Sequence, residues 1–189
     1  MTMDKRQDAL IKALRESDEE ISKAAAEALE KLRLREKLDF LAKKLESGDM
    51  LERIKAVYAV ADIKGDKVLE FLSKASADSA EDVRAAVARV LGSCADQRAM
   101  PLLVEMLKDS NVMVLRSAVD SCAKYNDIRF LAQLMQLLKN ADAGVVEKAL
   151  EAVARLGDKR AEEAMLYFVS KGNKAMRLIA LRALGEMDR

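Results

Sequence analysis

A five-position pattern of apolar and small residues recurs six times along this chain of 189 residues. It is clearest at Val83, Ala86, Val87, Val90 and Leu91, which share one face of a helix by their spacing. The copies begin at positions 21, 53, 83, 115, 146 and 176, so the period is 30 to 32 residues. Such a period is typical of solenoids, in which every repeat is one small structural unit.

A second apolar helix is predicted before most of these stripes. Asp66, Asp96, Asp127 and Asp158 recur every 30 or 31 residues, each close to the start of such a helix. There a carboxylate can accept hydrogen bonds from the free N–H groups of the first turn. The pattern therefore predicts twelve helices, over residues 4–15, 18–33, 35–47, 49–63, 66–76, 79–93, 96–109, 111–125, 127–140, 142–156, 158–171 and 173–187.

The linkers between these helices are short, so consecutive helices are expected to run antiparallel. One pair cannot bury its apolar stripe alone, whereas stacked pairs share a continuous core. The sequence therefore predicts one all-α domain over residues 1–189, a solenoid of six pairs. The expected pairs are about 1–33, 34–63, 64–93, 94–125, 126–156 and 157–189.

The overall charge gives no sign of a polyanionic partner, since 33 basic residues face 32 acidic ones. No apolar run approaches the roughly 20 residues that a membrane span needs. The first residues lack the apolar region of a signal peptide, so a cytoplasmic location is expected.

Catalytic and metal chemistry finds little support in the residues. The chain has no histidine, which removes the usual general base and a common zinc ligand. Glycine-rich nucleotide motifs and the nucleophile-elbow motif are absent. Cys94 and Cys122 are 28 residues apart and form no metal or redox motif, and Cys122 falls on an apolar stripe. We expect no enzyme activity, no cofactor and no metal, and a buried reduced thiol at Cys122.

The best-preserved copy resembles a HEAT repeat, of the short bacterial and archaeal kind related to bilin-lyase repeats. The resemblance rests on Val83-Arg84, Leu91-Gly92, Asp96 and Met100-Pro101-Leu102-Leu103. It implies a right-handed α-α superhelix in which the helix carrying Pro101 is convex and the one carrying Arg84 is concave.

The resemblance also implies a ladder of aspartate–arginine pairs between repeats. Asp78 with Arg84 and Asp109 with Arg116 fit such a ladder, whereas the last two copies break it. We therefore expect apolar packing alone to hold residues 142–187, and this part to open first.

Positions between the stripe residues of each concave helix give a candidate partner-binding face. Seven of these positions are basic and six are acidic, Asp62 among the acids, and small residues line the centre at Ala59, Ala85, Ala88, Ser117 and Ser121. A phosphate-binding face would carry one sign of charge, so nucleic acid is a weaker alternative. The candidate residues are Lys55, Tyr58, Arg89, Ser117, Asp120, Ser121, Lys148, Arg155 and Arg182.

The last helix has Leu178 and Leu181 outside its stripe, although a terminal repeat usually carries a polar outer face. A possible interface with a partner or a second copy is expected there. The sequence as a whole predicts a non-enzymatic scaffold or adaptor that binds another protein or peptide on its concave face. An accessory subunit of a bilin-lyase type enzyme and a nucleic-acid binder stay open as alternatives.

Overall fold

The computed structural model describes residues 5–61, 63, 65–94 and 96–187, and this part of the chain contains helices and no strands. The elements are α1 (Lys5–Ala13), α2 (Glu19–Ser47), α3 (Met50–Ala59), α4 (Asp66–Ala75), α5 (Glu81–Ser93), η1 (Gln97–Ala99), α6 (Met100–Met106), α7 (Val112–Tyr125), η2 (Ile128–Phe130), α8 (Leu131–Leu137), α9 (Ala143–Leu156), η3 (Lys159–Ala161), α10 (Glu162–Lys171) and α11 (Lys174–Glu186). The η elements are short 3₁₀ turns that lead into α6, α8 and α10.

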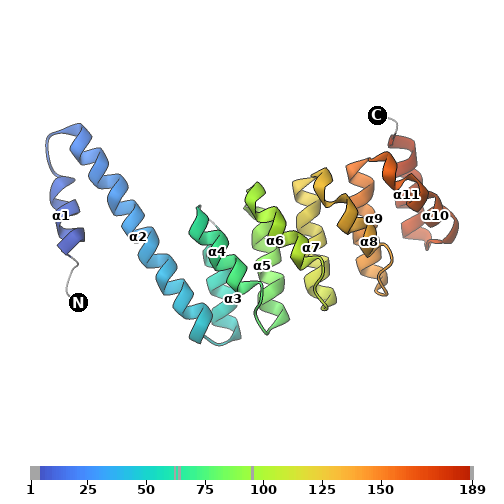
Figure 1. Cartoon of the computed structure of the whole chain (residues 1–189), viewed down its shortest axis with the longest axis horizontal. Coiled ribbons are helices and arrows are strands. Elements are labelled where there is room, and N and C mark those ends of the chain that lie inside the picture. The colour runs from blue at the N-terminus through green and yellow to red at the C-terminus, as the bar shows by residue number, and fades with distance from the viewer. Residues whose placement is uncertain (1–4, 62, 64, 95, 188–189) are drawn as a thin grey trace.

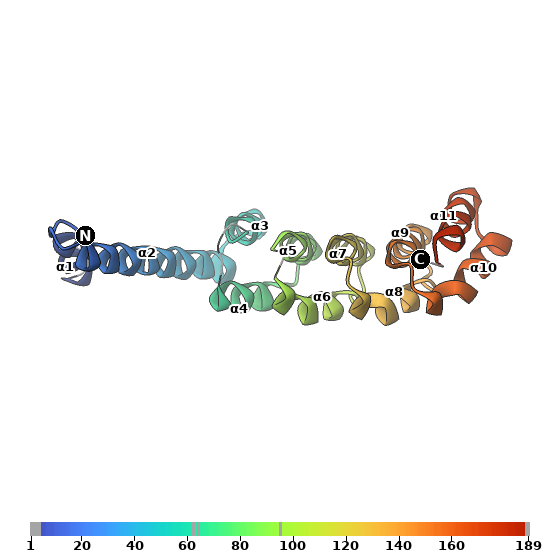
Figure 2. The ribbon, with the colours of Figure 1, turned by 90° about the horizontal axis from the view of Figure 1, so that it is seen from above.

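The helices form a two-layered row (Figures 1 and 2). Helices α3, α5, α7, α9 and α11 make one layer, which we call the inner layer, and α4, α6, α8 and α10 make the outer layer. Each outer helix runs back beside an inner helix, so the expected all-α solenoid is confirmed. None of the helices in the described residues is long and apolar enough to cross a membrane.

The core between the layers repeats with the sequence. Leu72, Leu103, Leu134 and Met165 stand 31 residues apart on the four outer helices, and each is at most 1% exposed. They meet the inner-helix stripe, in which Val83, Ala86, Val87, Val90 and Leu91 are also fully buried. Because these positions recur in register, the stacked pairs share one continuous core, which extends from Leu38 on α2 to Met187.

Three of the four aspartates expected at helix starts act as caps. Asp96, Asp127 and Asp158 each accept a hydrogen bond from the backbone N–H two residues later, at 2.9 Å. The arginine at that position also donates to the same carboxylate. Asp66 differs, because it is the first residue of α4 and binds Arg98 instead.

The N-terminal part departs from the prediction. Residues 18–33 and 35–47 were expected as two helices, but they form the single helix α2 of 29 residues. The reason is local, because the residues around the expected break, Arg33 to Lys37, are all good helix formers without glycine, proline or a cap. The described residues therefore hold eleven α-helices rather than twelve, and the first two pairs are not separate units. The grouping of residues 1–189 into one domain stays a prediction.

The aspartate–arginine ladder is present in a different register. Arg53 binds Asp78, Arg84 binds Asp109 and Arg116 binds Asp142, so each arginine reaches the start of the next inner helix. The expected pairs Asp78–Arg84 and Asp109–Arg116 were wrong, although Arg84 does donate to the backbone oxygen of Asp78 at 2.8 Å. The ladder also extends one step further towards the C-terminus than expected, to α9.

The third step of the ladder is weaker than the first two. Arg53 and Arg84 make two bonds to their carboxylates, with distances of 2.7 to 3.1 Å, and their partners are mostly buried. Arg116 makes one bond of 2.7 Å to Asp142, and its buried Nε atom has no partner. Gly144 leaves room for this guanidinium, since a Cβ atom there would lie 2.3 Å from Arg116 Nη2.

Candidate functional site

The inner layer carries a depression of about 450 Å³ at its centre. It is formed by the predicted concave helices α5, α7 and α9, through Arg89, Ser117, Asp120, Ser121, Ala123, Lys124, Lys148, Glu151, Ala152 and Arg155. Because the repeats align in register, side chains far apart in the sequence meet here. We call this surface the inner groove.

Six of the nine predicted partner-binding residues line the inner groove. They are Arg89, Ser117, Asp120, Ser121, Lys148 and Arg155. Tyr58 adjoins it, because Arg89 Nη1 donates to the Tyr58 hydroxyl at 3.3 Å and so links α5 to α3. Lys55 on α3 and Arg182 on α11 are exposed but do not line the groove. Asp62 lies outside the described residues.

The small residues at the centre do not form an open surface, contrary to the prediction. Ala85 and Ala88 are fully buried, and Ser117 and Ser121 are 6% and 1% exposed. They let α5 and α7 approach closely, since the Ser121 hydroxyl donates to the Ala88 carbonyl at 2.7 Å. A Cβ atom on Gly92 would lie 2.3 Å from Ser121 Oγ, which leaves no space there. Ser117 and Ser121 therefore shape the floor of the groove and offer little surface to a partner.

The exposed wall of the inner groove carries an excess of positive charge. Lys148 binds Asp120 with distances of 2.6 and 2.8 Å, which leaves that pair neutral. Arg89, Lys124 and Arg155 form no ion pair within the described part of the chain, and Glu151 is the one further acid of the lining. The sequence pattern had placed Lys124 and Glu151 on this face, but neither was among the nine candidate binding residues.

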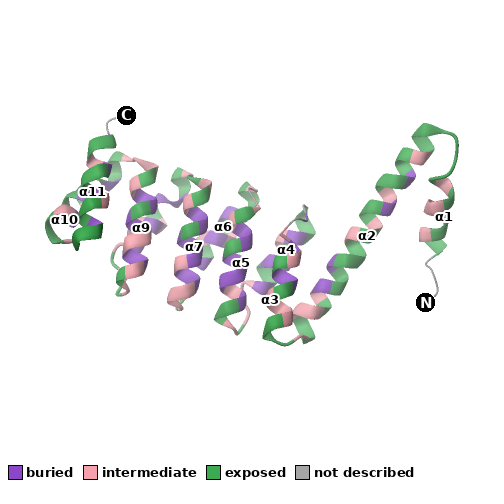
Figure 3. Cartoon of the chain, turned by 180° about the vertical axis from the view of Figure 1, so that it is seen from behind, coloured by how far each residue is buried: buried purple, intermediate pink, exposed green. Residues whose placement is uncertain are grey.

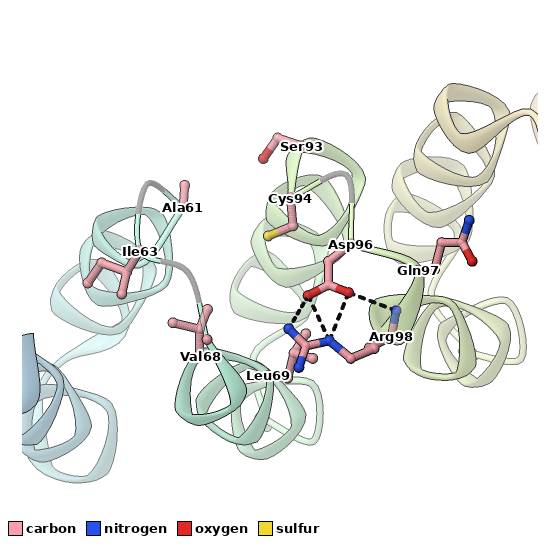
Figure 4. Close-up of a pocket in the computed structure, with 10 residues that line it drawn as sticks. Ala61, Ile63, Val68, Leu69, Ser93, Cys94, Asp96, Gln97 and Arg98 are labelled. Carbon is pink, nitrogen blue, oxygen red and sulfur yellow. Dashed lines mark hydrogen bonds and ion pairs between the residues drawn. The ribbon is translucent and has the colours of Figure 1, made fainter.

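A larger cavity, of about 640 Å³, lies at the edge of the stack where the loops after α3 and α5 meet (Figure 4). Ile63, Val68 and Leu69 form its apolar side, and Cys94, Asp96 and Arg98 lie opposite. Its charged groups are already paired, because Arg98 donates to Asp96 and to Asp66. No pattern in the sequence indicates this cavity, since it arises from how two loops pack.

Both cysteine thiols of the chain, Cys94 beside this cavity and Cys122 on α7, are poor nucleophiles. Burial raises the pKa of the half-buried Cys94 thiol, and the neighbouring Asp96 carboxylate raises it further. Burial raises the pKa of Cys122 to about 12, and its side chain is 1% exposed, which confirms the expected buried thiol. Both groups are therefore protonated near neutral pH. Among the described residues, no three Cys, Asp or Glu side chains are placed to hold a metal ion.

The family is decided by sequence comparison. The profile of HEAT repeats matches residues 7–82 and 69–154, most of the chain. The chain belongs to the HEAT-repeat family. The HEAT-repeat assignment agrees with the repeated pairs, the continuous core and the resemblance seen in the sequence. No curated protein sequence matches the chain.

Solved structures with similar folds include natural and designed helical-repeat proteins. The complex of CpcE and CpcF of phycocyanin lyase from Nostoc sp. PCC7120 has a TM-score of 0.66 and 20% identity, over 79% of this chain and 64% of that chain. Human deoxyhypusine hydroxylase in complex with glycerol has a TM-score of 0.63 and 21% identity, over 85% of this chain and 66% of that chain. A designed armadillo repeat protein in complex with peptide (KR)4 has a TM-score of 0.57 and 19% identity, over 97% and 100%.

These similarities concern the fold. This HEAT-repeat chain spans slightly less than two thirds of the lyase chain and of the hydroxylase chain. The neighbours include a two-protein complex and a peptide complex, which shows that related folds bind other polypeptides.

Proposed function

We propose that this HEAT-repeat protein is a non-enzymatic adaptor that binds a segment of another protein in the inner groove. The observation that carries the proposal is the set of exposed cations Arg89, Lys124 and Arg155 above a closely packed floor. The floor is rigid, because buried small residues and the Ser121 hydrogen bond join α5 to α7. A rigid surface loses little conformational freedom when a partner binds.

The charge of the groove favours an acidic segment. Three unpaired cations surround the neutral Lys148–Asp120 pair, so carboxylates of an incoming chain find arginine and lysine donors there. Arginine is a frequent anchor in interfaces because its planar fork binds a carboxylate through two hydrogen bonds. Tyr58 extends the same surface on α3 and is held by Arg89.

Nucleic acid is the less favoured ligand of this groove. Asp120 and Glu151 interrupt the positive surface, which weakens the attraction to a row of phosphates. Tyr58 is the one aromatic residue beside the groove among the described residues, so stacking of several bases lacks partners.

The test is capture of proteins from a lysate of the source cell on the immobilised full-length chain, with bound proteins identified by mass spectrometry. The Arg89→Glu variant should lose a protein that the wild type retains, because a carboxylate then faces the acidic segment. Lys108→Glu is a matched control, since Lys108 is exposed on the outer side of the stack. Equal capture by all three chains would refute the groove as the binding surface, and binding of labelled duplex DNA instead would favour the other ligand class.

A further inference from the structure

The hairpin of α1 and α2 leaves one face of α2 without a neighbour. α1 and the N-terminal half of α2 project beyond the stacked pairs and are mostly exposed (Figures 1 and 3). Ile21, which begins the first copy of the apolar pattern, is 43% exposed, whereas Val83 in the third copy is fully buried. α2 therefore carries a repeat pattern that its own chain only partly covers.

The uncovered face is a groove of about 360 Å³. It runs along three turns of α2 and is lined by Leu14, just after α1, and by Ala26, Leu29, Glu30, Arg33, Leu34 and Lys37 of α2. Leu29 is only 5% exposed and forms the floor of the groove. The lining residues of α2 recur at intervals of three and four, so they form one stripe of the helix. The exposed residues of the stripe are Ala26, Glu30, Arg33 and Lys37, whereas Leu34 at its edge packs with Leu38, Ala42 and Leu45 on the side that faces the stack.

The chemistry of this stripe is complementary to itself. A second α2 laid antiparallel, with its centre between Lys31 and Leu32, brings the exposed residues Ala26, Glu30, Arg33 and Lys37 of the two copies together. The same register places Glu30 opposite Arg33 of the second copy, and the small Ala26 opposite the long Lys37. Each of these pairs occurs twice across a two-fold axis, which is the usual symmetry of a homodimer.

Two exposed apolar residues lie at the ends of the same face. Phe40 continues the stripe beyond Lys37 and is 59% exposed. Leu14 is 41% exposed and lies at the other end, where its carbonyl accepts a hydrogen bond from Ser22 at 3.1 Å. In the antiparallel register, Phe40 faces Lys23 of the second copy and lies beside Leu14 of that second copy. The covered stretch, from about residue 23 to residue 40, is about 26 Å long.

The charges of α2 support the same arrangement. Residues 18–30 contain five acids and one base, and residues 31–37 contain four bases and one acid. Acidic residues at a helix start stabilise the helix through its dipole, but this effect falls off within the first turn. It therefore does not explain the acidic residues Glu27 and Glu30, which lie further along α2. Two antiparallel helices bring each acidic half against a basic half, whereas a parallel pair would bring like charges together.

The exposed leucines of α11 lack this complementarity. Leu178 and Leu181 are 45% and 51% exposed, but the surrounding charges of α11 are Lys174, Arg177 and Arg182 against the single Glu186. A second copy of α11 would mainly meet like charges.

We propose that two copies of this protein associate through an antiparallel, two-fold contact between their α2 helices, centred between Lys31 and Leu32. The contact lies at the N-terminal end of the row and leaves the inner groove on α5, α7 and α9 free (Figure 2).

Sedimentation velocity of the full-length chain tests this arrangement. The wild type should sediment as a species of twice 20.9 kDa. Glu30→Arg and Arg33→Glu should each weaken the dimer by about tenfold, because each creates two repulsive contacts. The double variant Glu30→Arg/Arg33→Glu restores opposite charges across the axis and should return to wild-type association.

Matched controls separate this contact from others. Lys31→Glu changes a charge on the opposite side of α2 and should leave the dimer intact, as should Leu178→Lys/Leu181→Glu. All these side chains are exposed, so circular dichroism should show folded chains throughout.

A monomeric wild type, or a dimer that both single charge reversals leave unchanged, would overturn the proposal. Loss of the dimer in the α11 variant alone would do the same and would move the contact to α11. Arg89→Glu should not alter the dimer, so failure of this proposal and failure of the inner-groove proposal give different results.

Discussion

Arg84 is the residue whose replacement should destabilise the solenoid most clearly without opening a large cavity. Its guanidinium binds both oxygens of Asp109, at 2.7 and 3.1 Å, and donates to the backbone oxygen of Asp78 at 2.8 Å. The Arg84 and Asp109 side chains are only 16% and 12% exposed. Methionine at this position keeps most of the apolar stem and removes the guanidinium.

The expected cost of Arg84→Met is about 2–3 kcal/mol in the free energy of unfolding. This estimate reflects the mostly buried Asp109 carboxylate, which would lose its charged partner and keep only the bond from the Asn111 N–H. For a chain of this size, such a loss lowers Tm by roughly 5–10 °C. Circular dichroism melts and urea titrations would measure it.

Arg116→Met is the internal control. Arg116 makes a single bond to Asp142, and the two side chains are 42% and 30% exposed, so its replacement should cost clearly less. An equal loss for the two variants, or an unchanged Tm for Arg84→Met, would refute the ranking of the ladder steps.

The effect of Arg84→Met should also depend on pH. Burial raises the pKa of Asp109, but hydrogen bonds from Arg84 and from the Asn111 N–H outweigh burial, so the pKa lies below its usual value. A lowered carboxylate pKa contributes stability that is present above about pH 4 and is lost as pH falls through the folded-state pKa. The stability difference between wild type and Arg84→Met should therefore shrink below about pH 4.

Three further outcomes follow from the packing. Gly92→Ala should lower stability by about 1–3 kcal/mol, because its Cβ would lie 2.3 Å from Ser121 Oγ, and Ser121→Gly in the same chain should recover part of the loss in urea titrations. The buried Cys122 thiol, with its pKa raised to about 12, should react with Ellman's reagent at pH 8 much more slowly in the folded chain than in urea, and equal rates would contradict its burial. Within the stack, amide exchange should be fastest in α10 and α11, because the ladder ends at Asp142, and protection equal to that of α5 and α7 would contradict this.

The sequence predicted the stack well because its information is periodic. The stripe of Val83 to Leu91 and the outer positions Leu72, Leu103, Leu134 and Met165 specify which faces are buried. The caps at Asp96, Asp127 and Asp158 could also be predicted, because a short side-chain acceptor just before an apolar helix usually accepts a hydrogen bond from the free N–H groups of the first turn. The merging of two expected helices into α2 was missed, since the spacing of the copies outweighed the absence of any helix-breaking residue near Leu34.

The candidate site was predicted only in part. Helical periodicity placed Arg89, Asp120, Lys148 and Arg155 on one face, and they line one groove. Periodicity could not distinguish whether Ser117 and Ser121 face a partner or the neighbouring helix, because their exposure depends on how closely α5 and α7 approach each other. The cavity beside Cys94 depends on loop packing between repeats and leaves no periodic signal.

The most direct test of the account is a calorimetric titration of the protein captured on the inner groove with wild-type chain and with Arg89→Glu. The predicted result is a Kd at least about tenfold higher for the variant, with a Tm equal to that of the wild type, because Arg89 is exposed and its side chain hydrogen-bonds only to the Tyr58 hydroxyl among the described residues. An unchanged Kd in a chain that folds normally would contradict the inner groove as the binding surface.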